Sequence, residues 1–198
     1  MSIKENLLHS VGATEENYNA GDYIFRESTT ALFYYQVVSG EVKLNNYNSD
    51  GKEFIQNIHT ADDALGVSML FLEKSYPMNA VAINRCTILK ICRNSFFKLL
   101  NLHPQLYTDV CTSLSDRLYK KYVLMKSISC HNASERLKEV MRLMKHEQQN
   151  QSPYSFEIPL TRQQLASLTG LCIETTIRTI KKMEKEKILR IQNRKILF

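Results

Sequence analysis

No run of about 18 apolar residues occurs in this chain of 198 residues, so the sequence predicts no membrane span. The first residues, Met-Ser-Ile-Lys-Glu-Asn, lack the apolar core of a secretory signal, and we therefore expect a cytoplasmic protein. The length suits one or two domains with a sizeable core.

Paired or metal-binding cysteines are also lacking. The five cysteines are odd in number, widely scattered and without C-x-x-C spacing: Cys86, Cys92, Cys111, Cys130 and Cys172. This pattern indicates neither a disulfide framework nor a metal site. We expect buried small hydrophobic residues, with a redox-sensing thiol as the alternative.

The motifs of common enzymes are missing as well. The chain has no Ser/His/Asp order, no metal-ligand spacing and no glycine-rich phosphate loop. We therefore predict a protein that is not an enzyme, with no catalytic residues, no metal and no cofactor.

Net positive charge is concentrated in one segment. Residues 160–198 hold nine Lys and Arg against three Asp and Glu, whereas residues 1–159 hold seventeen of each. A basic segment of this kind suits a phosphate backbone. Two alternatives are a solvated helix face and a basic tail that binds a protein or membrane partner.

The basic segment contains a helix-turn-helix pattern. Thr161 followed by Gln164 is a capping box, and the helix that it begins has leucines on one face. Gly170 ends that helix, and a second helix is predicted from near Cys172. A second helix of this motif enters the major groove of DNA, where arginine binds guanine and glutamate accepts from cytosine.

The N-terminal half has the pattern of short strands. Residues 1–18 resemble a polar helix or arm. The β-rich runs that follow are Tyr23–Phe25, Leu32–Val38, Glu41–Tyr47, Phe54–Ile58 and Ala80–Ile91. Asp50-Gly51 between two of them indicates a hairpin, and the set predicts a small antiparallel barrel or sandwich.

Helices dominate the next section. Residues 95–102 and about 104–129 are predicted helices, with Pro104 in a first turn. The longer one carries a coiled-coil seam at alternating steps of four and three: Leu114, Leu118, Lys121, Met125 and Ile128. Self-association would bury this seam, and packing within one chain is the alternative.

The remaining elements complete the C-terminal part. Asn132 and Glu135 predict another helix cap, before a helix whose apolar stripe is typical of core. A polar loop at 146–153 and a short strand at 156–158 follow. Strands at 188–191 and 195–198, joined by the turn 192–194, predict a small basic wing.

This order of parts resembles the Crp/Fnr superfamily of bacterial transcription regulators over nearly the whole chain. The resemblance is most specific in Thr161-Arg162-Gln163-Gln164, Gly170, Glu174-Thr175 and Arg178. It implies an α+β fold with an N-terminal antiparallel β-roll like that of cyclic-nucleotide-binding domains at 1–103. A long dimerisation helix at 104–131 and a C-terminal winged helix-turn-helix at 132–198 would follow.

The resemblance also implies roles for single residues. Glu174 and Arg178 would read base edges, and Ile173 could contact a thymine methyl or serve packing. Phosphate contacts are expected from Thr161, Arg162, Gln163, Thr175, Lys181, Lys182, Arg194 and Lys195. Ile173 and Ile177 depart from the catabolite-activator and fumarate-nitrate patterns respectively, so the resemblance leaves the operator sequence open.

The sensor end departs further from the family. Cyclic-nucleotide binders place an acid and an arginine where this chain has Val67 and Met78. Two residues that contact adenine correspond to Lys121 and Tyr122. The degenerate effector pocket would comprise Gly66, Val67, Ser68, Met78, Asn79 and Tyr122. Because a buried phosphate without its cation is costly, we predict no binding of cyclic AMP or cyclic GMP.

Other cofactors of the family have little support. No cysteine precedes Cys86, so the N-terminal iron–sulfur cluster of oxygen sensors is not expected. None of the histidines has a context that distinguishes a haem ligand: His9, His59, His103, His131 and His146.

The partners expected are therefore double-stranded DNA and a second copy of the chain, and no membrane. RNA polymerase at the loop 146–153 and an unidentified small effector are candidates. The twofold operator would have half-sites about 34 Å apart.

Overall fold

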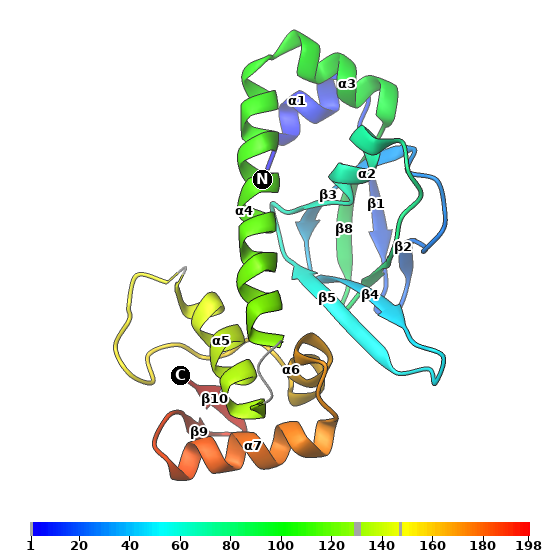
Figure 1. Cartoon of the computed structure of the whole chain (residues 1–198). Coiled ribbons are helices and arrows are strands. Elements are labelled where there is room, and N and C mark those ends of the chain that lie inside the picture. Colours follow the sequence, from blue (N-terminus) through cyan, green and yellow to red (C-terminus); the bar gives the residue numbers. More distant parts are fainter. Residues whose placement is uncertain (1, 129–131, 147) are drawn as a thin grey trace. The chain divides into compact units, whose positions relative to one another are not determined.

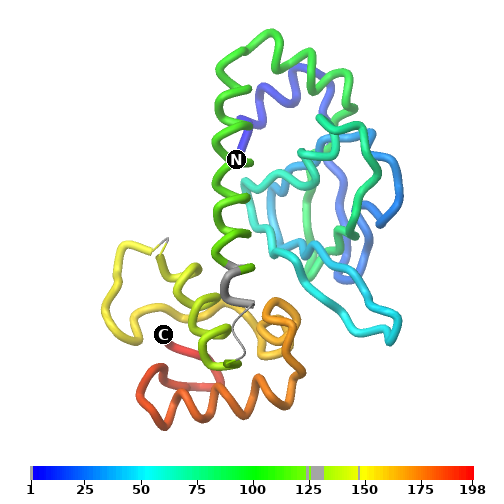
Figure 2. Tube along the Cα trace, in the orientation of Figure 1, coloured from blue at the N-terminus to red at the C-terminus, as the bar shows by residue number. Residues whose placement is uncertain are grey.

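The computed structural model describes residues 2–128, 132–146 and 148–198. Residues 1, 129–131 and 147 lie outside this description, as do the side chains of residues 124 and 126–128. Cys130 and His131 are therefore not covered. The chain, traced in Figure 2, divides into two compact units, Met1–Asp116 and Arg117–Phe198. Each unit has its own hydrophobic core.

Antiparallel sheets form the main part of the first unit (Figure 1). One four-stranded sheet has the order β1-β8-β3-β6 and the other β2-β7-β4-β5. The strands are β1 Thr14–Tyr18, β2 Tyr23–Phe25, β3 Phe33–Ser39, β4 Val42–Tyr47, β5 Glu53–His59, β6 Ala64–Leu65, β7 Asn79–Ala82 and β8 Cys86–Cys92. The predicted antiparallel β-roll is confirmed.

The predicted Asp50-Gly51 hairpin joins β4 to β5. Gly51 has a φ of 73°, a conformation that glycine adopts at low cost. The Oδ1 atom of Asn48 accepts hydrogen bonds from the backbone N–H groups of Asp50 at 3.1 Å and Lys52 at 2.8 Å. The side chain of Asn48 therefore stabilises the turn.

Strand β3 is buried on both faces, from Tyr34 to Val37. The ring of Tyr34 stacks on Phe96 of helix α3 (Arg93–Leu102), with ring centroids 4.6 Å apart. The ring of Tyr35, which alternates to the other face, lies 5.8 Å from Phe25 of β2. The β3 run is thus buried without alternation because helices and the second sheet cover its two faces.

The first residues of the chain belong to this core. Ile3 and Leu8 are buried, and Leu8 lies on helix α1 (Glu5–Ser10), which packs beside α3. The buried Gln36 side chain accepts hydrogen bonds from the Ile3 N–H at 2.9 Å and the Tyr34 hydroxyl at 2.7 Å. It also donates to the Ile3 carbonyl at 3.0 Å. These bonds hold the N-terminal segment on the sheet.

Several sequence predictions for this unit need correction. Residues 1–18 are more than a polar helix or arm, because β1 forms there and pairs with β8. The run 80–91 is two strands, separated by a turn at 83–85 that lets β7 and β8 join different sheets. Strand β6 and helix α2 (Val67–Leu72) were not predicted, since neither is long enough to show a periodic pattern.

Helix α4 spans Gln105–Ile128. Leu106 and Val110, near its start, are buried in the first core, and Leu114 is partly buried against it. Leu118 is 49% exposed and Met125 66% exposed, and Lys121 is exposed as well. The seam therefore remains uncovered at these positions, and the side chain of Ile128 is outside the description.

Besides the C-terminal half of α4, the described residues of the second unit form three helices and a hairpin. They are α5 Ala133–His146, α6 Arg162–Thr169, α7 Ile173–Lys185, β9 Arg190–Gln192 and β10 Lys195–Leu197. The predicted cap at Asn132 is present, since its Oδ1 accepts from the Ser134 N–H at 2.9 Å. The segment 156–158, predicted as a strand, forms only an isolated bridge between Glu157 and Leu197.

Candidate nucleic-acid interface

Helix α6 begins with the predicted capping box. The Thr161 hydroxyl accepts from the Gln164 N–H at 3.1 Å, and the Gln164 side chain accepts from the Thr161 N–H at 2.8 Å. Two of the four N–H groups without helical partners are thereby satisfied. Leu165 and Leu168 are buried in the unit, so α6 is fixed both by its cap and by its apolar face.

The turn between α6 and α7 depends on Gly170. Its φ is 68°, the left-handed conformation in which side chains with a Cβ are disfavoured. A Cβ added there would meet no atom within 4 Å, so the requirement is conformational and not one of space. The Leu171 N–H then bonds back to the Ala166 carbonyl at 3.1 Å. The tight turn predicted from the sequence is confirmed.

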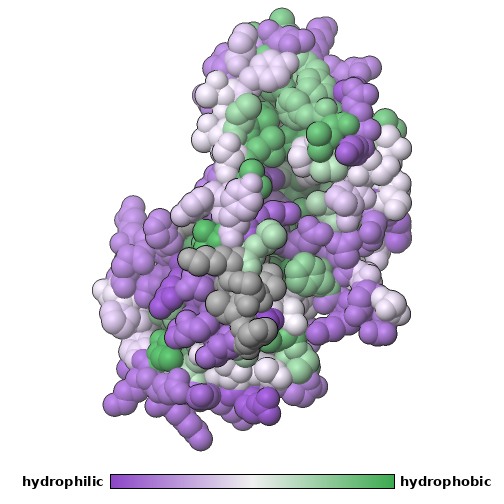
Figure 3. Space-filling model, viewed as in Figure 1, coloured by the Kyte–Doolittle hydropathy of each residue, from purple (hydrophilic) through white to green (hydrophobic). Residues whose placement is uncertain are grey.

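Helix α7 separates a buried face from a charged one. Thr176, Thr179, Ile180 and Met183 are buried against the second core. The exposed residues Glu174, Arg178, Lys181, Lys182 and Lys185 follow at helical spacing and share the opposite face. With Ile177, these residues line a shallow surface hollow along the helix. Hydrophilic residues cover this part of the surface in Figure 3.

The charges on α7 follow the helix dipole. Glu174 lies in the first turn, where the positive end of the helix dipole favours an acid. Lys182 and Lys185 lie in the last turn, where the negative end favours a cation. Lys182 is 3.7 Å from Glu186, and both side chains are well exposed, so the pair is weak. The described residues offer no ion-pair partner to Arg178. Its guanidinium is therefore available to an outside ligand.

The residues that flank this face are half-buried. Ile173 and Thr175 are partly covered, as is Ile177. The Thr175 hydroxyl lies 2.9 Å from the sulfur of Cys172, which occupies the N-cap position of α7. This hydrogen bond lowers the pKa of the exposed Cys172 thiol below its ordinary value. The prediction of buried cysteines holds for Cys86 and is wrong for Cys92, Cys111 and Cys172, which are exposed.

The wing is a two-residue hairpin. Asn193 and Arg194 connect β9 to β10 with φ values of 50° and 65°, the signs that a type I′ turn requires. The Arg162 guanidinium donates to the Arg194 carbonyl at 3.3 Å, which ties the wing to the start of α6. Lys195 lies 2.7 Å from the carboxylate of Glu157, so a phosphate at this position must compete with that carboxylate.

Sequence reasoning missed two features of this unit. Lys185 lies on the charged face of α7, and its spacing of four from Lys181 was the available signal. Lys145 is 8% exposed although it is charged, and its ammonium donates to the carbonyls of Ser152 at 2.6 Å and Phe198 at 2.8 Å. No sequence pattern indicates which lysine will be buried in this way.

The predicted effector-pocket residues of the first unit are packed. Gly66 has a φ of 63°, and a Cβ there would lie 2.5 Å from the ring of Tyr76. Val67 and Met78 belong to the hydrophobic core. Asn79 is buried too, and its side chain accepts from the Glu27 N–H at 2.9 Å and donates to the Asn45 carbonyl at 3.3 Å.

The other members of the predicted pocket differ from these. Ser68 is half-buried near the start of α2. Tyr122 lies on α4 in the second unit and is 61% exposed, so its grouping with the others stays a prediction. Among the described residues, no group of three or more His, Cys, Asp or Glu side chains could hold a metal ion.

A capped helix, a left-handed glycine turn, an exposed basic helix and a hairpin wing define a winged helix-turn-helix protein of the DNA-binding class. Two family models match the chain: a cyclic nucleotide-binding domain at residues 15–103 and a Crp-like helix-turn-helix domain at residues 135–198. No described helix is both long and apolar enough to span a membrane.

Similar proteins agree with these models. The cAMP-activated global transcriptional regulator CRP of Haemophilus influenzae is 25% identical over 96% of this chain and 83% of its own length. The fumarate and nitrate reduction regulatory protein of Yersinia pestis is 24% identical over 89% and 71%. The structure of a CooA variant from Carboxydothermus hydrogenoformans has a TM-score of 0.85 at 18% identity, covering 100% of this chain and 91% of that one.

The chain belongs to the Crp/Fnr family of transcription regulators. Its helix-turn-helix unit is a DNA-binding domain. The matched relatives are regulators and not enzymes, which confirms the single prediction that this protein is not an enzyme.

Proposed function

We propose that this regulator binds a twofold DNA operator as a homodimer, with α7 of each copy in a major groove. The observation that carries the proposal is the exposed face of α7, where Glu174 and Arg178 lie near the N-terminal end and lysines continue along the helix. Arg178 reads guanine and Glu174 accepts from cytosine N4, while Ile173 touches an apolar base edge.

Phosphate contacts supply most of the affinity in this proposal. They come from the start of α6, from Thr175, from the lysines of α7 and from the wing: Thr161, Arg162, Gln163, Thr175, Lys181, Lys182, Arg194 and Lys195. The bond from Arg162 to the Arg194 carbonyl supports a joint role for the helix start and the wing, because it fixes one beside the other.

The dimer forms along α4 in this proposal. Leu118 and Met125 are large apolar side chains that are about half exposed or more, and a matching helix would cover them. A twofold axis along the paired helices sets half-sites about 34 Å apart. We propose a sensor-like domain at 1–103, a dimerisation helix at 104–131 and the DNA-binding domain at 132–198.

The β-roll does not respond to cyclic AMP or cyclic GMP in this proposal. Val67 and Met78 are core residues and offer neither an acid nor a cation to a nucleotide. A cyclic phosphate at this place would be buried without a countercharge, which costs several kcal/mol. An effector, if the β-roll binds one, has different chemistry.

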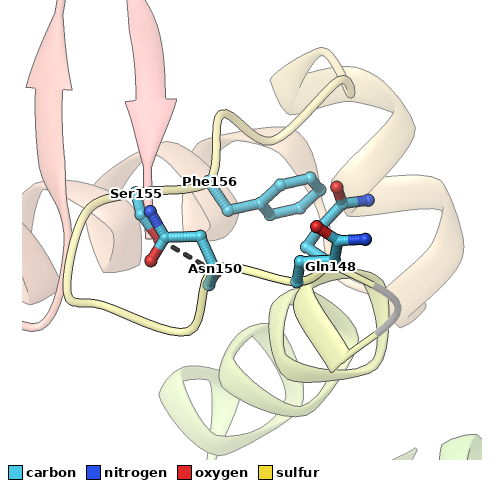
Figure 4. A pocket seen from close by; sticks show the side chains of 5 residues that line it. Gln148, Asn150, Ser155 and Phe156 are labelled. Carbon is cyan, nitrogen blue, oxygen red and sulfur yellow. Dashed lines mark hydrogen bonds between the residues drawn. The ribbon is translucent and has the colours of Figure 1, made fainter.

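The loop 146–153 is the proposed contact for RNA polymerase. Gln148, Asn150, Ser155 and Phe156 surround an open polar pocket there, and Ser155 donates to the Asn150 carbonyl at 3.1 Å (Figure 4). The Gln151 side chain donates to the Lys145 carbonyl at 2.9 Å. These bonds hold Asn150 and Gln151, and the side chains of Gln148 and Asn150 remain exposed, which supports their use as a recognition surface.

Selection of bound sequences from random duplexes tests the proposal. The expected result is a palindromic site whose half-sites contain the guanine read by Arg178. Titrations of the selected duplex at several salt concentrations should show a steep salt dependence. If no sequence is enriched, the proposed operator recognition is wrong. The basic segment would then serve a protein or membrane partner.

A further inference from the structure

One residue of the α4 seam is charged. In heptad terms Cys111, Leu118 and Met125 occupy the a positions, and Leu114, Lys121 and Ile128 occupy the d positions. Five of these six side chains are apolar or weakly polar. Lys121 is exposed, and the described residues offer its ammonium no ion pair or hydrogen-bond partner.

The flanking positions supply no negative charge. Between Leu114 and Met125, the e and g positions are Ser115, Arg117, Tyr122 and Leu124. Coiled coils usually place acids at such positions to pair with a lysine of the other helix. The nearest acid in sequence, Asp116, is at an f position, on the side of the helix away from the seam. A partner helix of identical sequence therefore cannot neutralise Lys121.

The symmetry of the proposed dimer brings these charges together. Both DNA-binding units must lie at the same end of the dimer, so the two α4 helices run parallel and in register. Lys121 then faces its own copy across the twofold axis. Tyr122, at the adjacent e position, is 61% exposed and adds a phenolic O–H donor from each copy.

We propose that the paired α4 helices bind a small anion carrying two or more negative charges, held by the two Lys121 ammonium groups and the Tyr122 hydroxyls. This inference rests on the proposed dimer. A multivalent anion is the ligand class because it alone offsets both like charges at once and accepts hydrogen bonds from ammonium and phenol groups. Anion binding and dimerisation are then linked, and each strengthens the other.

Sedimentation equilibrium of the full chain tests the linkage, with inorganic tripolyphosphate as the probe and sodium chloride of equal ionic strength as the reference. For the unmodified chain, tripolyphosphate should lower the dimer dissociation constant about tenfold. Lys121→Leu should lower that constant by about tenfold or more in chloride alone, because leucine is buried in the seam without a charge. Tripolyphosphate should then have no further effect.

The control variant is Lys98→Gln, which removes an exposed lysine of α3 and leaves the seam intact. It should respond to tripolyphosphate like the unmodified chain, whereas Lys121→Gln should not respond. An anion effect that survives in Lys121→Gln would overturn the inference, as would a Lys121→Leu dimer no tighter than the unmodified one. If every form stays monomeric, the proposed homodimer fails as well, and a stable dimer that ignores the anion contradicts only the anion site.

Discussion

Replacing Arg178 by alanine should remove discrimination at the contacted guanine and leave most of the DNA affinity. The guanidinium is exposed and has no ion-pair partner among the described residues, so its removal breaks no internal ion pair. A bidentate contact between arginine and guanine is worth about 1–3 kcal/mol of discrimination. This corresponds to roughly 5- to 150-fold in each half-site.

Fluorescence anisotropy measures this effect with two duplexes, the selected operator and one in which the contacted guanine is replaced in both half-sites. The unmodified protein should bind the selected operator more tightly than the altered duplex, by at least the roughly 5- to 150-fold expected for one half-site. Arg178→Ala should bind both duplexes equally. The slope of log affinity against log salt should stay nearly constant, because every phosphate remains bound by the same side chains as before.

Lys182→Ala is the matched comparison on the same helix. This variant should bind both duplexes more weakly and to the same degree, and its salt slope should be smaller by about 0.9 for each phosphate that it no longer neutralises. The ion pair with Glu186 at 3.7 Å makes the affinity loss smaller than for an unpaired lysine. A uniform loss in Arg178→Ala, with a slope change like that of Lys182→Ala, would refute base reading by Arg178.

Three further predictions concern stability and thiol reactivity. Thr161→Ala removes the cap of α6, and Gly170→Ala places a side chain at a left-handed φ. Each should destabilise the DNA-binding unit by about 1 kcal/mol, measured as faster hydrogen exchange in α6. Lys145→Met should cost about 1–3 kcal/mol because two carbonyls lose their charged donor, and exchange in α5 should accelerate accordingly. Iodoacetamide at about pH 7.5 should alkylate Cys172 faster than Cys86, since the Thr175 hydroxyl lowers the pKa of Cys172 and burial raises the pKa of Cys86. Equal rates by mass spectrometry would contradict that ordering.

The sequence predicted best the elements with local chemical signals. The capping box at Thr161, the left-handed Gly170 and the start of α7 at Cys172 each depend on interactions within a few residues. Glu174 and Arg178 were placed near the start of α7 because the second helix was predicted to begin at Cys172, whereas Lys185 on the same face was missed. The Asp50-Gly51 hairpin was found for the same reason, because its turn needs only its own residues.

Predictions failed where distant parts of the chain decide the outcome. Strand β1 has an exposed, acidic sequence and becomes a strand only because β8, about 70 residues away, offers an edge. Strand β6 has two residues, too few for any periodicity. The exposure of three cysteines could not be predicted, because composition says only that cysteine is usually buried.

The amide of Gln36 has a consequence for how this protein can be handled. Its oxygen and nitrogen both bond to the backbone of Ile3, so an interior strand recognises a residue at the very start of the chain. A shortened form beginning at residue 5 would leave this buried amide without those partners and would also remove the apolar side chain of Ile3 from the core. Trimming the first four residues is therefore equivalent to an internal core mutation, although it alters only the end of the chain.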